Sequence, residues 1–134
     1  MPHLIVEYSA NFAADVDPPK LAKHLADAAV ETGVFPVAGL RVRFHPVEDY
    51  RIADGHVDNA FLHLMIRMGH GRDLDTRKHA GEAIFKALCD YFDAAFGRRP
   101  VGLSMEMVEI HPDLNFKQNN MREYIKARGA QAAE

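Results

Sequence analysis

The chain has 134 residues, of which 48% are hydrophobic and 26% are charged, as expected for one soluble globular domain with a real core. Its formal net charge of −3 gives no electrostatic reason to expect a nucleic-acid partner. The sequence has neither an apolar run long enough to span a bilayer nor a signal-peptide pattern, so we expect no membrane association. The single cysteine, Cys89, excludes an internal disulfide and fits a reducing, cytoplasmic location.

The first half of the chain predicts a strand, a helix and a second strand. Residues 3–9 alternate between apolar and other side chains, which is typical of a half-buried strand. An acidic residue and two prolines open the segment 17–33, whose apolar side chains recur at helical spacing until a glycine. Residues 40–45 alternate again and predict a strand that ends at Pro46. Residues 47–54 could form either a strand or a loop.

The same order of elements repeats in the second half. Alternation predicts a strand at residues 60–68, helical periodicity predicts a long helix at 73–96, and a further alternating segment predicts a strand at 101–110. A short helix is expected at residues 120–128. The last residues, 129–134, are expected to fray.

Each half therefore forms a β-α-β unit, and the two units make an internal pseudo-repeat. The units cover residues 2–46 and 59–112 of a single domain, 1–134, with a C-terminal tail at 113–134. A β-α-β unit implies parallel strands joined by a right-handed crossover. Two units predict an α+β fold with one four-stranded sheet and both helices on one face. A ferredoxin-like sandwich has the same element order and stays open as an alternative.

The face of the sheet without helices is expected to be apolar. It would carry either the alternating set that begins with Leu4 or the set that begins with Ile5. An uncovered apolar face needs a partner, which predicts an oligomer.

Pro2 is the first candidate for chemistry. Removal of Met1, which is usual before a small residue, would make the nitrogen of Pro2 a secondary amine. Free α-amino groups have a pKa of about 7.7–8.0, and a general base works best with a pKa near the operating pH. A strand that begins at the next residue would hold this amine rigidly. If Met1 stays attached, the same nitrogen is an amide without basicity and Pro2 only opens a strand.

Three arginines are candidates for binding an anionic substrate. Arg41 and Arg43 are two residues apart on one predicted strand, so they share a face. Arg72 lies in a Gly-His-Gly-Arg turn before a helix, where backbone N–H groups and positive charge favour anions. A guanidinium binds a carboxylate in bidentate fashion, and nearby cations lower the pKa of an amine. The set predicts a dicarboxylate substrate, although each arginine alone could be a surface residue.

The other reactive side chains carry no motif. The eight histidines include no pair at the spacing of a metal site on one element; His63 and His70 are seven residues apart. We therefore expect no metal. Cys89 has no nucleophile motif, which favours a buried helical position for it.

Five segments are distinctive when they are taken together. They are Pro-His-Leu-Ile-Val-Glu-Tyr-Ser at 2–9, Gly-Val-Phe-Pro-Val-Ala-Gly-Leu-Arg-Val-Arg at 33–43, Ala-Asp-Gly-His at 53–56, Gly-His-Gly-Arg at 69–72 and His-Pro-Asp-Leu-Asn-Phe-Lys-Gln-Asn-Asn at 111–120. In these segments the chain resembles the 5-carboxymethyl-2-hydroxymuconate isomerases of the tautomerase superfamily. The segment Leu114–Asn120 is the most diagnostic part, although its residues suggest no chemistry by themselves.

The resemblance implies a tautomerase-like fold assembled as a homotrimer. It also implies an isomerase of the intramolecular oxidoreductase class, which transposes a C=C bond and interconverts keto and enol forms without cofactor or metal. The substrate would be an unsaturated di- or tricarboxylate of aromatic catabolism through homoprotocatechuate. Pro2 corresponds to the catalytic proline, Arg41 and Arg72 correspond to arginines that bind substrate carboxylates, and Arg43 is a further candidate.

Two alternatives remain at this stage. An enzyme of the same fold could act on a different unsaturated acid, for example as a dehalogenase or decarboxylase. It would need a further acid or base, for which Glu7 and Glu106 are the candidates. A trimeric binding module could instead keep the fold without catalysis, and it would retain Met1.

Overall fold

The structure is a computed structural model that describes residues 1–129. The C-terminal residues 129–134 were expected to fray, and residues 130–134 lie outside the described residues. The elements in chain order are β1 (His3–Ser9), η1 (Ala10–Asp15), α1 (Pro18–Glu31), η2 (Val37–Gly39), β2 (Arg41–Val47), β3 (Ala60–Gly69), α2 (Leu74–Tyr91), α3 (Asp93–Phe96), β4 (Val101–Ile110), η3 (Pro112–Leu114) and α4 (Met121–Ala127). No helix within residues 1–129 is both long and apolar enough to cross a bilayer.

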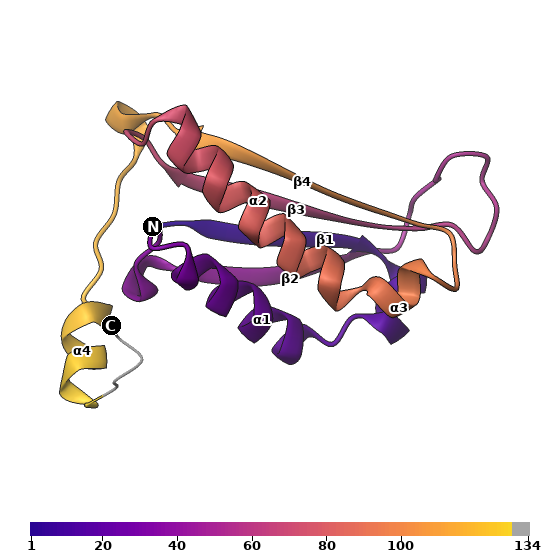
Figure 1. Cartoon of the computed structure of the whole chain (residues 1–134), viewed down its shortest axis with the longest axis horizontal. Helices are drawn as coiled ribbons and strands as arrows, with labels where there is room; N and C mark the ends of the chain where they lie inside the picture. Colours follow the sequence, from indigo (N-terminus) through magenta and orange to yellow (C-terminus); the bar gives the residue numbers. More distant parts are fainter. Residues whose placement is uncertain (130–134) are drawn as a thin grey trace.

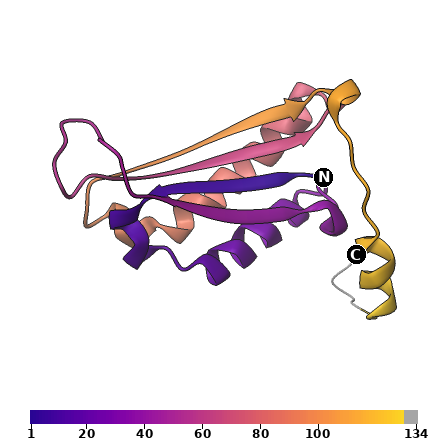
Figure 2. The same cartoon turned by 180° about the vertical axis from the view of Figure 1, so that it is seen from behind.

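The four strands form one mixed sheet in the order β2-β1-β3-β4. β1 pairs in parallel with β2 and β3 pairs in parallel with β4, while the central pair β1–β3 is antiparallel. Helices α1 and α2 lie side by side on one face (Figure 1), and the opposite face has no helix over it (Figure 2). The predicted pair of β-α-β units is confirmed. The ferredoxin-like alternative is wrong, because the two strands of each unit are direct neighbours instead of being split by another strand.

Both long helices begin where the sequence places an aspartate. The Asp17 carboxylate accepts a hydrogen bond from the backbone N–H of Lys20 at 3.3 Å, and two prolines occupy the first turn of α1. The Asp73 carboxylate accepts from the backbone N–H of Thr76 at 2.7 Å. These caps satisfy backbone donors that the first helical turn leaves free.

Two predicted boundaries are wrong for tertiary reasons. Pro46 does not end β2, which continues to Val47, because β2 is an edge strand and edge strands tolerate proline. The predicted helix 73–96 is interrupted at Phe92, whose ring packs against Phe12 with centroids 5.1 Å apart. Phe92 is only 2% exposed, so the chain leaves helical geometry where this ring enters the core. The undecided segment 47–54 lies mostly in the loop between β2 and β3.

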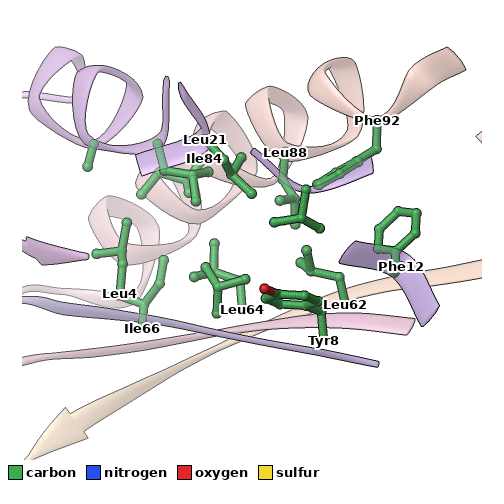
Figure 3. Close-up of a cluster of buried hydrophobic side chains, with 14 of the residues drawn as sticks. Leu4, Tyr8, Phe12, Leu21, Leu62, Leu64, Ile66, Ile84, Leu88 and Phe92 are labelled. Carbon is green, nitrogen blue, oxygen red and sulfur yellow. The ribbon is translucent and has the colours of Figure 1, made fainter. Parts of the chain in front are cut away.

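The core lies between the sheet and the two helices, as Figure 3 shows. The Leu4 set of β1 points into it and is fully or almost fully buried. The labelled core side chains are Leu4, Tyr8, Phe12, Leu21, Leu62, Leu64, Ile66, Ile84, Leu88 and Phe92. The Ile5 set therefore occupies the open face of the sheet, the face without helices.

The open face is not the apolar surface that was expected. Ile5 and Met65 are paired at its centre, but the next pairs along the strands are Glu7 with His63 and His3 with Arg67. The register with β4 adds Phe61 and Val108 to this face, so the open face mixes apolar side chains with polar and charged ones. The predicted oligomer stays a prediction.

After β4 the chain leaves the sheet and runs past the N-terminus to α4 (Figures 1 and 2). Residues 111–127 are called the C-terminal arm below. The arm contacts the body at η2, and the side-chain amide of Asn119 donates a hydrogen bond to the carbonyl of Ala38 at 2.9 Å. This contact brings a segment from the end of the sequence beside the first residues of β1.

Candidate active site

Pro2 is held firmly at the start of β1. It is buried, and its carbonyl accepts a hydrogen bond from the backbone N–H of Arg41 at 3.0 Å. Gly39 packs against its ring so closely that a Cβ atom at position 39 would lie 3.3 Å from Pro2 Cδ. The same Cβ would lie 3.4 Å from Cα of Met1. The backbone of β2 and the end of η2 therefore fix where the ring of Pro2 sits.

Two of the predicted arginines lie near this terminus, and backbone carbonyls hold both. Arg41 Nη1 donates to the carbonyls of Ala38 and Leu40 at 3.2 and 3.3 Å. Arg72 Nη2 donates to the carbonyl of Val34 at 2.8 Å. Within residues 1–129 neither guanidinium forms a salt bridge with a carboxylate. Each is therefore positioned while its charge stays available to an anion.

The electrostatic effect of these cations is seen at the amino group of Met1. Burial lowers the pKa of this amine below its ordinary value, and the positive charges of Lys117, Arg41 and Arg72 lower it further. Both causes disfavour the protonated form. The N-terminus thus lies in a partly buried, positively charged environment, which suits a neutral amine and an anionic ligand.

Arg43 has a different neighbour. It is exposed, and its Nη1 lies 3.0 Å from Nδ1 of His3. Burial and then the charge of Arg43 lower the pKa of His3, which favours a neutral ring. Arg41 and Arg43 were expected to act together, but Arg43 is engaged with His3 on the open face while Arg41 is engaged with backbone carbonyls beside η2.

A pocket of about 460 Å³ opens beside the N-terminus. Its lining residues come from both ends of the chain and from η2: Met1, Pro36, Ala38, Gly39, Lys117, Asn119, Arg122 and Glu123. Sequence reasoning did not assign the last four to a site, because they lie on the arm without any motif. The available signal was the diagnostic segment Leu114–Asn120, which contains two of them.

The candidates for an additional acid or base lie away from this pocket. Glu106 Oε2 is 2.7 Å from Nε2 of His63, and Nδ1 of the same ring is 2.7 Å from Oγ of Ser104. Glu7 is paired with His63 in the sheet register. These side chains form a polar cluster on the open face, so the structure does not bring Glu7 or Glu106 to Pro2.

Cys89 and His70, which the sequence analysis left without a role, have clear surroundings in the structure. Cys89 lies on α2, where it is half-buried instead of fully buried, and burial raises the pKa of its thiol. Nδ1 of His70 lies 3.7 Å from a carboxylate oxygen of Glu109 and does not approach His63. Among the described residues, no group of three or more histidine, cysteine or acidic side chains is placed to hold a metal ion.

The arrangement of the sheet and helices is that of the tautomerase superfamily. A solved structure described as a fused 4-OT wild-type symmetric trimer superposes with a TM-score of 0.62 at 16% identity, covering 87% of this chain and 93% of that one. At this identity the similarity shows the fold alone.

The family follows from closer relatives. Residues 2–125 match the family model described as 5-carboxymethyl-2-hydroxymuconate isomerase. The chain is 42% identical over 126 residues to the 5-carboxymethyl-2-hydroxymuconate Delta-isomerase of Escherichia coli, covering 94% of this chain and all of the relative. The crystal structure of a 5-carboxymethyl-2-hydroxymuconate isomerase from Deinococcus radiodurans R1 superposes with a TM-score of 0.84 at 34% identity, covering 97% and 95% of the two chains. The chain belongs to the 5-carboxymethyl-2-hydroxymuconate isomerase family, which confirms the resemblance seen in the sequence.

Proposed function

We propose that this protein is a 5-carboxymethyl-2-hydroxymuconate Δ-isomerase that works without cofactor or metal in the homoprotocatechuate route of aromatic catabolism. The observation that carries the proposal is the N-terminus, where Pro2 is buried and two arginines, Arg41 and Arg72, lie nearby. Within the described residues neither arginine forms a salt bridge with a carboxylate. The proposal places the enzyme in the cytoplasm, where the free thiol of Cys89 stays reduced.

Pro2 is the proposed general base. Removal of Met1 moves the amino group by one residue, to Pro2, which lies against η2 and the start of β2. The causes that lower the pKa of the Met1 amine act on the same region, so the Pro2 amine is expected below the ordinary 7.7–8.0, roughly, of an α-amino group. A neutral amine near pH 7 is the form that accepts a proton.

The reaction transfers one proton within the substrate. Pro2 takes the proton of the enol hydroxyl and returns a proton to a carbon further along the conjugated chain. The enol becomes a ketone and one C=C bond moves, so no atoms are gained or lost. Arg41 and Arg72 hold carboxylates and stabilise the negative charge of the dienolate. None of Arg41, Arg43 and Arg72 is among the lining residues of the pocket, and Arg43 contributes through its contact with His3.

Proton transfer by a placed base accounts for roughly 10²–10⁴-fold of the acceleration. Orientation by the arginines and charge stabilisation supply the remainder. Because only the first β-α-β unit begins with a proline, each chain carries one site.

We also infer a homotrimer in which the open faces of the three sheets meet. The open face has no helix over it and carries the Ile5–Met65 pair, and the fused 4-OT that shares the fold is a symmetric trimer. Light scattering that gives three times the mass of the chain would support this inference, and a stable monomer would contradict it.

Two measurements test the activity. The intact mass of the natively expressed protein should lack Met1, and the enzyme should convert 5-carboxymethyl-2-hydroxymuconate to the ketone, followed by ultraviolet absorbance. Pro2→Ala leaves a primary amine and should lower the rate without abolishing it. A full-length mass would rule out catalysis by Pro2, and a protein without Met1 that does not turn over this substrate would point to another unsaturated acid.

A further inference from the structure

Lys117 is, with Arg122, one of two cations that line the pocket and that the catalytic proposal does not use. It is exposed, lies in the irregular part of the C-terminal arm and lines the pocket together with Met1. The charge of Lys117 lowers the pKa of the Met1 amine more than the charge of Arg41 or Arg72 does. Within the described residues it forms no salt bridge, whereas Lys23 and Lys86 each pair with an aspartate.

The arm that carries Lys117 is docked instead of hanging free. The amide of Asn119 donates to the carbonyl of Ala38 at 2.9 Å, and its Oδ1 accepts from the backbone N–H of Met121 at 2.9 Å. The sulfur of Met121 in turn lies 3.9 Å from Nη2 of Arg41. These contacts attach the arm to η2, the element that also positions Pro2, and Lys117 lies on this docked arm in the lining of the pocket.

The proposed substrate carries three carboxylates, and the catalytic proposal assigns arginines to only two of them. Muconate is a dicarboxylate and its carboxymethyl substituent adds a third carboxylate. Arg41 and Arg72 account for two of the three. The two muconate carboxylates are conjugated and planar, which suits the fork of a guanidinium. The third turns about a CH₂ group, which suits the point charge and flexible stem of a lysine.

We propose that Lys117 binds the carboxymethyl carboxylate and thereby selects a tricarboxylate over a dicarboxylate. The inference rests on the proposed function and adds a specificity residue to its site. Lys117 acts on substrate recognition, so its removal should raise KM more than it lowers kcat.

The test compares two substrates that differ only in the third carboxylate. Wild type, Lys117→Gln and Lys117→Arg are assayed with 5-carboxymethyl-2-hydroxymuconate and with 2-hydroxymuconate. All assays are run at pH 9, above the ordinary pKa of an α-amino group, about 7.7–8.0, so that a changed charge at position 117 has little effect on the fraction of neutral amine. Inhibition by adipate and by 2-carboxymethyladipate gives the same comparison without requiring turnover.

Loss of a charge-assisted contact predicts a fall in kcat/KM of about 10- to 100-fold for the tricarboxylate in Lys117→Gln. The dicarboxylate should change by less than about twofold on the same reasoning, and Lys117→Arg should keep most of the tricarboxylate activity. Lys126→Gln, on the same arm but outside the pocket lining, is the control and should match wild type. If kcat/KM of Lys117→Gln falls equally with both substrates, or with neither, the assignment of Lys117 is wrong. Activity of the wild type would in that case still support the proposed function. A wild type inactive on both would overturn the proposed function itself.

Discussion

Gly39 is the position where one added methyl group should disturb the candidate base without unfolding the protein. A Cβ atom built at this position lies 3.3 Å from Cδ of Pro2, the carbon bonded to the amine nitrogen. Carbon atoms prefer separations of about 3.5–4.0 Å. Gly39→Ala therefore requires a shift of a few tenths of an ångström. The three atoms nearest to this Cβ belong to Pro2 and Met1. After removal of Met1 only the Pro2 atom is left, so the ring of Pro2 is the group that moves.

The expected effect on the rate follows from the size of this shift. A misplacement of 1 Å in a catalytic group costs on the order of 10²-fold, so a few tenths should lower kcat by about 3- to 10-fold. The effect on stability should be small. The crowding lowers the free energy of unfolding by up to about 1–3 kcal/mol. Alanine also restricts the unfolded chain, and because the backbone at position 39 is not left-handed this effect raises the free energy of unfolding by about 0.4–1 kcal/mol.

Steady-state kinetics and thermal melting of Gly39→Ala measure the two effects separately. Gly97→Ala is the matched control, because its nearest contacts would be ordinary ones at 3.6 and 3.7 Å and it follows α3, far from Pro2 in the sequence. We expect a slower enzyme of nearly unchanged melting temperature in the first case and wild-type behaviour in the second. Unchanged kcat in Gly39→Ala, or a rate loss explained by unfolding, would refute the view that η2 positions the amine.

The remaining predictions concern charge, pH and the core. Arg41→Ala should lower kcat/KM about 10- to 100-fold through loss of a charge-assisted contact, and Arg51→Ala in the β2–β3 loop should not; equal activity in both would contradict the carboxylate role. Because the burial and cations that lower the pKa of the Met1 amine lie in the same region as Pro2, and because the proposed base works when neutral, kcat/KM should rise with pH through a value below about 7.7–8.0 and then level off. A rate that still rises with pH above that range would contradict the charge argument. Leu88→Ala, at a side chain 0% exposed, should lower the free energy of unfolding by about 2–5 kcal/mol in urea titration. Leu74→Ala, 67% exposed, serves as the control, and a comparable loss there would show that burial is not the cause.

The regular elements could be predicted because their causes are local. The alternation in residues 3–9 and 60–68 and the aspartate caps at positions 17 and 73 determine strand and helix within a few residues of themselves. Pro2, Arg41 and Arg72 could be proposed as site residues from the sequence, because an N-terminal proline and a strand or turn arginine carry their chemistry in their residue type; their roles stay predictions.

Other features depend on neighbours that are distant in the sequence. Alternation alone does not say whether the Leu4 or the Ile5 set faces the helices, and the decision comes from how α1 and α2 pack on the sheet. Pro46 continues a strand because β2 lies at an edge, and Phe92 interrupts a helix because its ring meets Phe12. In each case packing outweighs the local preference.

The sequence by itself therefore determined the two β-α-β units and the family, and the proline with its arginines stays a prediction. Only the tertiary structure decided what surrounds the amine. The hydrogen bond between Asn119 and Ala38 joins residues 81 positions apart and brings Lys117 to the same pocket as Met1. No periodicity or motif encodes this contact, because a segment without regular structure takes its position from the surface on which it docks.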